Sequence, residues 1–204
     1  LMGGNNPITV QSMTNTITGD IEKTVKQILA LEDAGCDIIR VAVSNVNDAK
    51  AIKNIKKQIH IPIIADIQYD YKLALESIKY GIDGLRINPG NIGSMEKVKE
   101  VVKGCKENNL PIRIGVNSGS IKKEFMEKYN GVNENSMVYS ALEQIKYLED
   151  LDFFDIKIAL KGSSVPLTIK AYQKMAELVD YPFHLGITEA GTPWRGTIKS
   201  SVGL

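Results

Sequence analysis

Several apolar segments of this chain end on side chains suited to binding an anion, and two of them show the pattern most clearly. One ends with Arg86 and Asn88, and the other carries Arg113 and Asn117. Each pair is separated by an even number of residues, so in a β-strand both members lie on the same face. Parallel strands that carry Arg and Asn near their C-terminal ends are typical of the mouth of a β/α barrel, where active sites form.

Strand-like and helix-like stretches alternate along the chain. The expected strands are 8–13, 36–43, 61–67, 84–88, 112–117, 154–160 and 183–189. The expected helices are 20–34, 46–58, 71–80, 95–108, 135–151 and 165–179, and the longest connection between them is 118–134. This alternation predicts an α/β fold with a parallel sheet and right-handed crossovers.

The number of expected strands bears on the extent of the domain. A closed barrel of this type has eight strands, but only seven are expected here, and the last residues fall inside what should be the seventh helix. An open parallel edge is an unprotected pairing surface. We therefore predict one incomplete (β/α)8 TIM-barrel domain over residues 1–204, with the eighth strand missing, and interpret the chain as a fragment of a longer protein.

Composition excludes several classes of function. The 204 residues carry a formal net charge of +1, so there is no electrostatic footprint for nucleic acid. No apolar run approaches the ~18 residues that a membrane span requires, and the N-terminus lacks a signal-peptide pattern, so we expect a cytoplasmic protein. Cys36 and Cys105 are expected to be buried apolar residues, and without a Cys-x-x-Cys pair we expect no metal site in this chain.

The expected strand ends bring together several cationic side chains. Arg40, Arg86, Arg113 and Lys161, with the asparagines of the two opening segments, suit a phosphate or diphosphate, because guanidinium groups offer paired donors to phosphate oxygens. Glycine loops at 89–93 and 118–120 offer backbone amides to the same anion. The alternative for any one arginine is a structural ion pair with a carboxylate such as Asp66. Three buried arginines with one or two acids would leave uncompensated charge, which favours the anion site.

Glu189 is the candidate acid or base, because it ends the last apolar strand. A partly desolvated carboxyl group at that position can hold a proton near neutral pH. The alternative is a salt bridge to Lys161. His60 and His184 flank apolar runs at the N-terminal ends of strands, so a structural role is expected for both.

Five long motifs resemble one known family, the 4-hydroxy-3-methylbut-2-en-1-yl diphosphate synthases. They occur in the same order over nearly the whole chain: NNPITVQSMTNT (5–16), ADIQYDY (65–71), LRINPGNIG (85–93), RIGVNSGS (113–120) and HLGITEAG (184–191). The resemblance implies reductive opening of 2-C-methyl-D-erythritol 2,4-cyclodiphosphate in the methylerythritol phosphate route to isoprenoids. It also implies an oxidoreductase acting on CH or CH2 groups.

The same resemblance implies roles for individual residues. The diphosphate would be held by Arg40, Arg86, Asn88, Arg113, Asn117 and Lys161. Glu189 would lie beside the reacting carbons and handle the proton of the departing hydroxyl. A [4Fe-4S] cluster would supply two electrons taken from flavodoxin or ferredoxin, and the family is homodimeric. Its cluster ligands, three Cys and a Glu, belong to a C-terminal domain that we expect to be absent from this chain, so the chain alone should be inactive.

Two other interpretations stay open at this point. The first is a dihydropteroate-synthase-like barrel, which also pairs a diphosphate-bearing substrate with Arg, Lys and Asn at strand ends. The second is a non-catalytic fragment that binds anions loosely and associates through its open edge.

Overall fold

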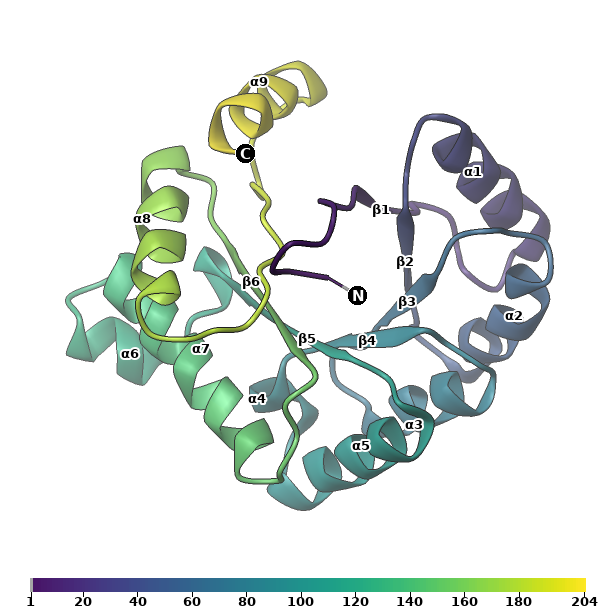
Figure 1. Ribbon diagram of the computed structural model, residues 1–204, viewed down its shortest axis with the longest axis horizontal. Coiled ribbons are helices and arrows are strands. Elements are labelled where there is room, and N and C mark those ends of the chain that lie inside the picture. The colour runs from purple at the N-terminus through teal and green to yellow at the C-terminus, as the bar shows by residue number, and fades with distance from the viewer. Residues whose placement is uncertain (1) are drawn as a thin grey trace. The chain divides into compact units, whose positions relative to one another are not determined.

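The computed structural model describes residues 2–204 and divides into two compact units, Leu1–Arg113 and Ile114–Leu204. Each unit is built from strands followed by helices (Figure 1). The strand β5 (Ile112–Asn117) begins in the first unit and continues into the second.

The first unit contains four neighbouring parallel strands. These are β1 (Gln11–Met13), β2 (Ile38–Ala42), β3 (Ile63–Asp66) and β4 (Gly84–Ile87). β5 follows β4 in the sheet, and the Leu85 N–H donates to the Pro111 carbonyl at 3.0 Å. The strand order equals the chain order, as expected for successive strand–helix–strand crossovers.

The helices of this unit lie along one side of the strands (Figure 1). Their bounds are α1 (Ile21–Asp33), α2 (Val46–Lys56), α3 (Tyr71–Lys79), α4 (Pro89–Ile92) and α5 (Met95–Asn108). Side chains cap the first three helices: Asp20, Asn45 and Asp70 each accept from backbone N–H groups in the first turn. The chain leaves α1 through Gly35, whose φ of 90° suits glycine, and this agrees with the expected end of the helix at residue 34.

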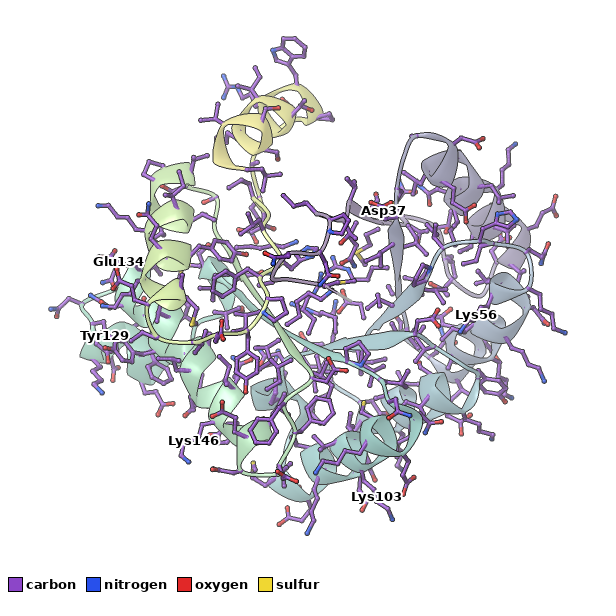
Figure 2. All side chains as sticks on the ribbon, viewed as in Figure 1. Asp37, Lys56, Lys103, Tyr129, Glu134 and Lys146 are labelled. Atoms are coloured by element: carbon purple, nitrogen blue, oxygen red, sulfur yellow. The ribbon has the colours of Figure 1, made fainter. Side chains whose placement is uncertain are left out.

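The core of the first unit lies between these strands and helices. Ile28, Ile39, Ile52, Ile63 and Ile87 are completely buried. Cys36 and Cys105 are buried, as predicted. Figure 2 shows the labelled Lys103 on the outer side of α5, where it is exposed.

The second unit contains the end of β5, the strand β6 (Ile156–Lys161) and its helices. The helical elements are the 3-10 turn η1 (Ser118–Ser120), α6 (Lys123–Lys128), α7 (Glu134–Glu149), α8 (Val165–Ala176) and α9 (Pro193–Gly203). Pro166 lies in the first turn of α8, where proline is tolerated. α6 was not predicted, because only a connection was expected over residues 118–134.

The predicted seventh strand, 183–189, is not confirmed. Within residues 2–204 the structure has six strands, and this segment makes one isolated parallel bridge, Ile158 to Phe183. The Ile158 N–H donates to the Pro182 carbonyl, and the His184 N–H donates to the Ile158 carbonyl, before the regular pairing stops. The first strand is also shorter than expected, beginning at Gln11, because Ile8 is 97% exposed and has no layer to pack against.

Two side chains of α8 explain why the pairing stops. The next ladder donor on β6, the Leu160 N–H, donates to the Tyr172 hydroxyl at 2.9 Å, and that hydroxyl donates to the His184 carbonyl. The following donor, the Gly162 N–H, donates to Thr168 Oγ1 at 3.2 Å. Residues four apart on a helix share a face, so α8 inserts both hydroxyls beside β6. The backbone groups are satisfied without a strand.

None of the helices in residues 2–204 is long and apolar enough to cross a membrane.

We predict that Tyr172→Phe destabilises the protein by about 1–3 kcal/mol, because it leaves the buried Leu160 N–H without its acceptor. Urea unfolding of wild type and variant measures the difference. Tyr69→Phe is the matched control, since Tyr69 is 69% exposed and should change stability by less than about 0.5 kcal/mol. Equal stability of the Tyr172 and Tyr69 variants would show that the hydroxyl bridge does not support this segment.

Candidate functional site

The first unit places a buried carboxylate between two arginines. Register pairs Asp66 with Arg86 on the neighbouring strand, and pairs Met13 with Arg40. Arg86 Nη1 donates to Asp66 Oδ1 at 3.0 Å, and Arg40 Nε lies 3.5 Å from Asp66 Oδ2. Asp66 is 5% exposed. Both arginines therefore meet one carboxylate near the C-terminal ends of β2, β3 and β4.

The electrostatics of this cluster are unbalanced. Burial lowers the pKa of the Arg40 guanidinium, Asp66 raises it, and the neighbouring Arg86 lowers it again. Arginine remains protonated in proteins, so the cluster carries two positive charges against one negative charge. The predicted ion pair with Asp66 exists, and it leaves positive charge uncompensated.

A third arginine is buried on the next strand. Arg113 lies on β5 and is 4% exposed, and its Nη1 donates to Gln11 Oε1 on β1 at 3.3 Å. The Met13 sulfur on the same strand accepts from Arg40 Nη2 at 2.9 Å and from Nε at 3.2 Å. Gln11 and Met13 therefore help to orient two of the guanidinium groups.

The two predicted asparagines shape the turns after their strands. The Asn88 side-chain oxygen accepts from the Gly90 N–H at 3.0 Å and caps the short α4, so its amide nitrogen is the group that can donate to an anion. Asn117 ends β5 in the second unit. Its backbone N–H donates to Ser120 Oγ, and its carbonyl accepts from that hydroxyl, which fixes the glycine turn Ser118–Ser120.

The second unit holds the remaining predicted site residues. Lys161 is the last residue of β6 and is half-buried, and Glu189 is exposed. Glu189 has a φ of 51°, a left-handed conformation that costs a non-glycine residue about 1–3 kcal/mol. A Cβ built on Gly119 would lie 3.9 Å from Glu189 Oε1, so the carboxylate lies over the glycine turn after β5. Such strain typically occurs at functional positions.

The sequence analysis did not single out the residues that hold residues 183–189 and the end of β6 in place. Tyr172 accepts from Leu160 on β6, Thr168 accepts from Gly162 just after β6, and Gly186 accommodates the Lys161 side chain. The spacing of Thr168 and Tyr172 on one helix face was the available signal. The structure confirms a structural contact for His60, whose backbone N–H and Nδ1 both meet the Glu32 carboxylate at 2.9 Å.

The residues present do not fit an iron–sulfur cluster. Such clusters are held mainly by cysteine thiolates. Cys36 Sγ donates to the Ile38 carbonyl, and Cys105 is buried on α5. Over residues 2–204 no group of three His, Cys, Asp or Glu side chains is arranged to hold a metal ion. No chemical step is assigned to a cluster in this chain.

We predict that Asp66→Asn destabilises the protein by about 3–5 kcal/mol, because it leaves two half-buried guanidinium groups without their buried carboxylate. Added sulfate should recover part of this loss, since an anion can replace the missing charge. Urea unfolding with and without sulfate is the measurement. Asp150→Asn is the control: its pair with Lys146 is exposed to solvent, so its loss should leave stability close to that of the wild type. A similar small effect for both variants would contradict the charge argument.

Comparison with known proteins identifies the family. The GcpE TIM-barrel domain matches residues 1–204. A 4-hydroxy-3-methylbut-2-en-1-yl diphosphate synthase (flavodoxin) from Fusobacterium nucleatum is 57% identical over 203 residues, covering 100% of this chain and 57% of the relative. The enzyme of that name from Caldanaerobacter subterraneus is 59% identical, with the same coverage. The chain thus spans a little over half the length of these relatives.

Solved structures support the fold alone. Dihydropteroate synthase from Yersinia pestis has a TM-score of 0.64 at 12% identity, covering 96% of this chain and 79% of that one. The N-acetylmannosamine-6-phosphate 2-epimerase from Clostridium perfringens has a TM-score of 0.52 at 15% identity, with 96% and 81% covered. The high identity lies with the diphosphate synthases, so the dihydropteroate-synthase-like alternative is not favoured. By its match over the whole length, the chain belongs to the GcpE family and forms a TIM-barrel domain of that family.

Proposed function

We propose that this chain is the substrate-binding barrel of a 4-hydroxy-3-methylbut-2-en-1-yl diphosphate synthase. Family membership over residues 1–204 supports this assignment. The proposed substrate is 2-C-methyl-D-erythritol 2,4-cyclodiphosphate, and the proposed product is the linear allylic diphosphate. The rest of the enzyme, including its iron–sulfur domain, would lie outside these residues.

One observation supports the substrate class more than any other. Arg40 and Arg86 share the single carboxylate of Asp66, which can neutralise only one of the two guanidinium groups. Buried charges are normally paired, so an excess of guanidinium groups favours an anionic ligand. A diphosphate offers several oxygens in the geometry that guanidinium donors prefer. We assign Asn88, Asn117 and Lys161 to the same ligand as further donors.

The proposed reaction breaks one carbon–oxygen bond of the ring and removes one hydroxyl. Two electrons and two protons enter, and the hydroxyl leaves as water. Glu189 would supply the proton of the departing hydroxyl as a general acid. Its strained backbone and its place over the Gly119 turn support this role, because both fix the carboxylate at the end of its segment.

The electrons would come from flavodoxin or ferredoxin through the [4Fe-4S] cluster of the second domain, which supplies one-electron chemistry when present. The enzyme would be an oxidoreductase acting on CH or CH2 groups and a homodimer in the bacterial cytoplasm. By this proposal the 204-residue chain binds the cyclic diphosphate but has no reductive turnover of its own.

We predict that Arg86→Ala or Arg113→Ala in the full-length enzyme loses ~2–4 kcal/mol of transition-state stabilisation, through lost charge-assisted hydrogen bonds. Steady-state kcat/KM for the cyclodiphosphate with reduced flavodoxin measures the loss. Lys103→Ala, on the exposed surface of α5, is the control. Unchanged kinetics in both arginine variants would remove the diphosphate assignment. Stronger thermal stabilisation by a pterin diphosphate than by the cyclodiphosphate would favour the dihydropteroate-synthase-like alternative.

We predict that Glu189→Gln in the full-length enzyme lowers kcat by roughly 10²–10⁴-fold, the usual range for losing a general acid. KM should change little, because the amide keeps the shape of the side chain. Turnover with dithionite or reduced flavodoxin is the measurement. Near-normal turnover of this variant would refute the role of Glu189, and reductive turnover by residues 1–204 alone would refute the proposed division between two domains.

A further inference from the structure

The Lys161 side chain lies directly across Gly186. A Cβ built on Gly186 would lie 2.9 Å from Lys161 Cε, 3.0 Å from Nζ and 3.4 Å from Cδ. Real Cβ atoms essentially never approach other heavy atoms closer than 3.0 Å, so the lysine could not follow this path over any larger residue. The contact involves the outer half of the side chain, which carries the charge.

The segment that carries Gly186 is held on both sides of this contact. The His184 N–H donates to the Ile158 carbonyl at 2.7 Å, and the Thr188 N–H donates to the Gly162 carbonyl at 3.2 Å. Between these bonds, the Tyr172 hydroxyl accepts from the Leu160 N–H on β6 and donates to the His184 carbonyl, so the segment is held without a continuous ladder. The backbone at Gly186 is therefore held in place beside the Lys161 side chain.

Backbone conformation does not explain this glycine. Gly186 is not among the residues with positive φ, unlike Gly191 in the same segment. An alanine at position 186 would therefore meet no backbone strain of the left-handed kind. What the position requires is the absence of a side chain where the lysine passes.

We propose that Gly186 is a positioning residue that sets the place of the Lys161 ammonium group, and through it the affinity of the site for the phosphate end of the substrate. The inference rests on the proposed function, in which Lys161 binds the diphosphate. A methyl group at position 186 pushes away the far end of a flexible side chain, which costs little stability. It moves a positive charge, however, and charge-assisted hydrogen bonds depend on that geometry.

The test is Gly186→Ala in the full-length enzyme. KM for the cyclodiphosphate should rise about 10-fold, equivalent to about 1.4 kcal/mol, which is near the lower end of what a hydrogen bond to a charged group contributes. The value of kcat should change less than about 2-fold, because the weakened interaction contributes equally to binding of the substrate and of the transition state. Gly196→Ala is the control: a Cβ there meets only Ala190 Cβ at 3.8 Å, an ordinary contact, and KM should not change.

A double-mutant cycle with Lys161→Ala separates this inference from the proposed function. If Gly186 acts through Lys161, then Gly186→Ala raises KM in the wild-type background and has no effect once Lys161 is alanine. An equal rise in both backgrounds would overturn the inference. So would a rise for Lys161→Ala with none for Gly186→Ala, and that result would leave the proposed function intact. An unchanged KM for Lys161→Ala would reject the lysine's proposed role, and the inference with it.

Folding supplies a second readout. If Gly186→Ala alone does not fold, the double variant Gly186→Ala/Lys161→Ala should fold, because the displaced side chain is gone. Thermal unfolding monitored by circular dichroism measures this rescue. Failure of the double variant to fold would show that the methyl group clashes with something other than Lys161, and the inference would be wrong.

Discussion

The buried carboxylate of Asp66 is the interaction on which the first unit's site depends. It accepts from Arg86 at 3.0 Å and lies 3.5 Å from Arg40, because parallel register brings β2, β3 and β4 into line. One carboxylate can hold two guanidinium groups in place, but it neutralises only one of them. The strand register thus brings two guanidinium groups to one carboxylate, which leaves this cluster with an excess of positive charge.

Simple periodicity predicted most of the strands and helices, and the predicted end of the first helix at residue 34 agrees with Gly35 just beyond it. Arg86 lies on β4 as the spacing predicted, but Asn88 follows the strand and caps α4 instead of sharing a strand face with Arg86. Periodicity could not predict that residues 183–189 would make only one isolated bridge to β6. Whether residues 183–189 pair with β6 is decided by the hydroxyl of Tyr172, which reaches Leu160 from another element. An apolar run shows where a strand can form. It does not show whether a side chain from another element accepts the backbone hydrogen bonds that a neighbouring strand would otherwise accept.

Fold and function are supported here by different observations. Dihydropteroate synthase shares the architecture with a TM-score of 0.64, yet only 12% of aligned residues are identical. The same scaffold hosts many activities, so function has to be argued from the site. In this chain the candidate residues are Arg40, Arg86 and Arg113 in the first unit, and Lys161 and Glu189 in the second. The relatives at 54–59% identity show the family to which the chain belongs.

A crystal structure of the protein soaked with 2-C-methyl-D-erythritol 2,4-cyclodiphosphate tests the central claim most directly. The account predicts phosphate oxygens at about 2.7–3.2 Å from the guanidinium nitrogens of Arg86 and Arg113, the ordinary hydrogen-bond range. Asp66 should remain paired with Arg86 in that complex. A diphosphate bound away from both arginines, with Arg40 and Arg86 contacting only Asp66, would contradict the account.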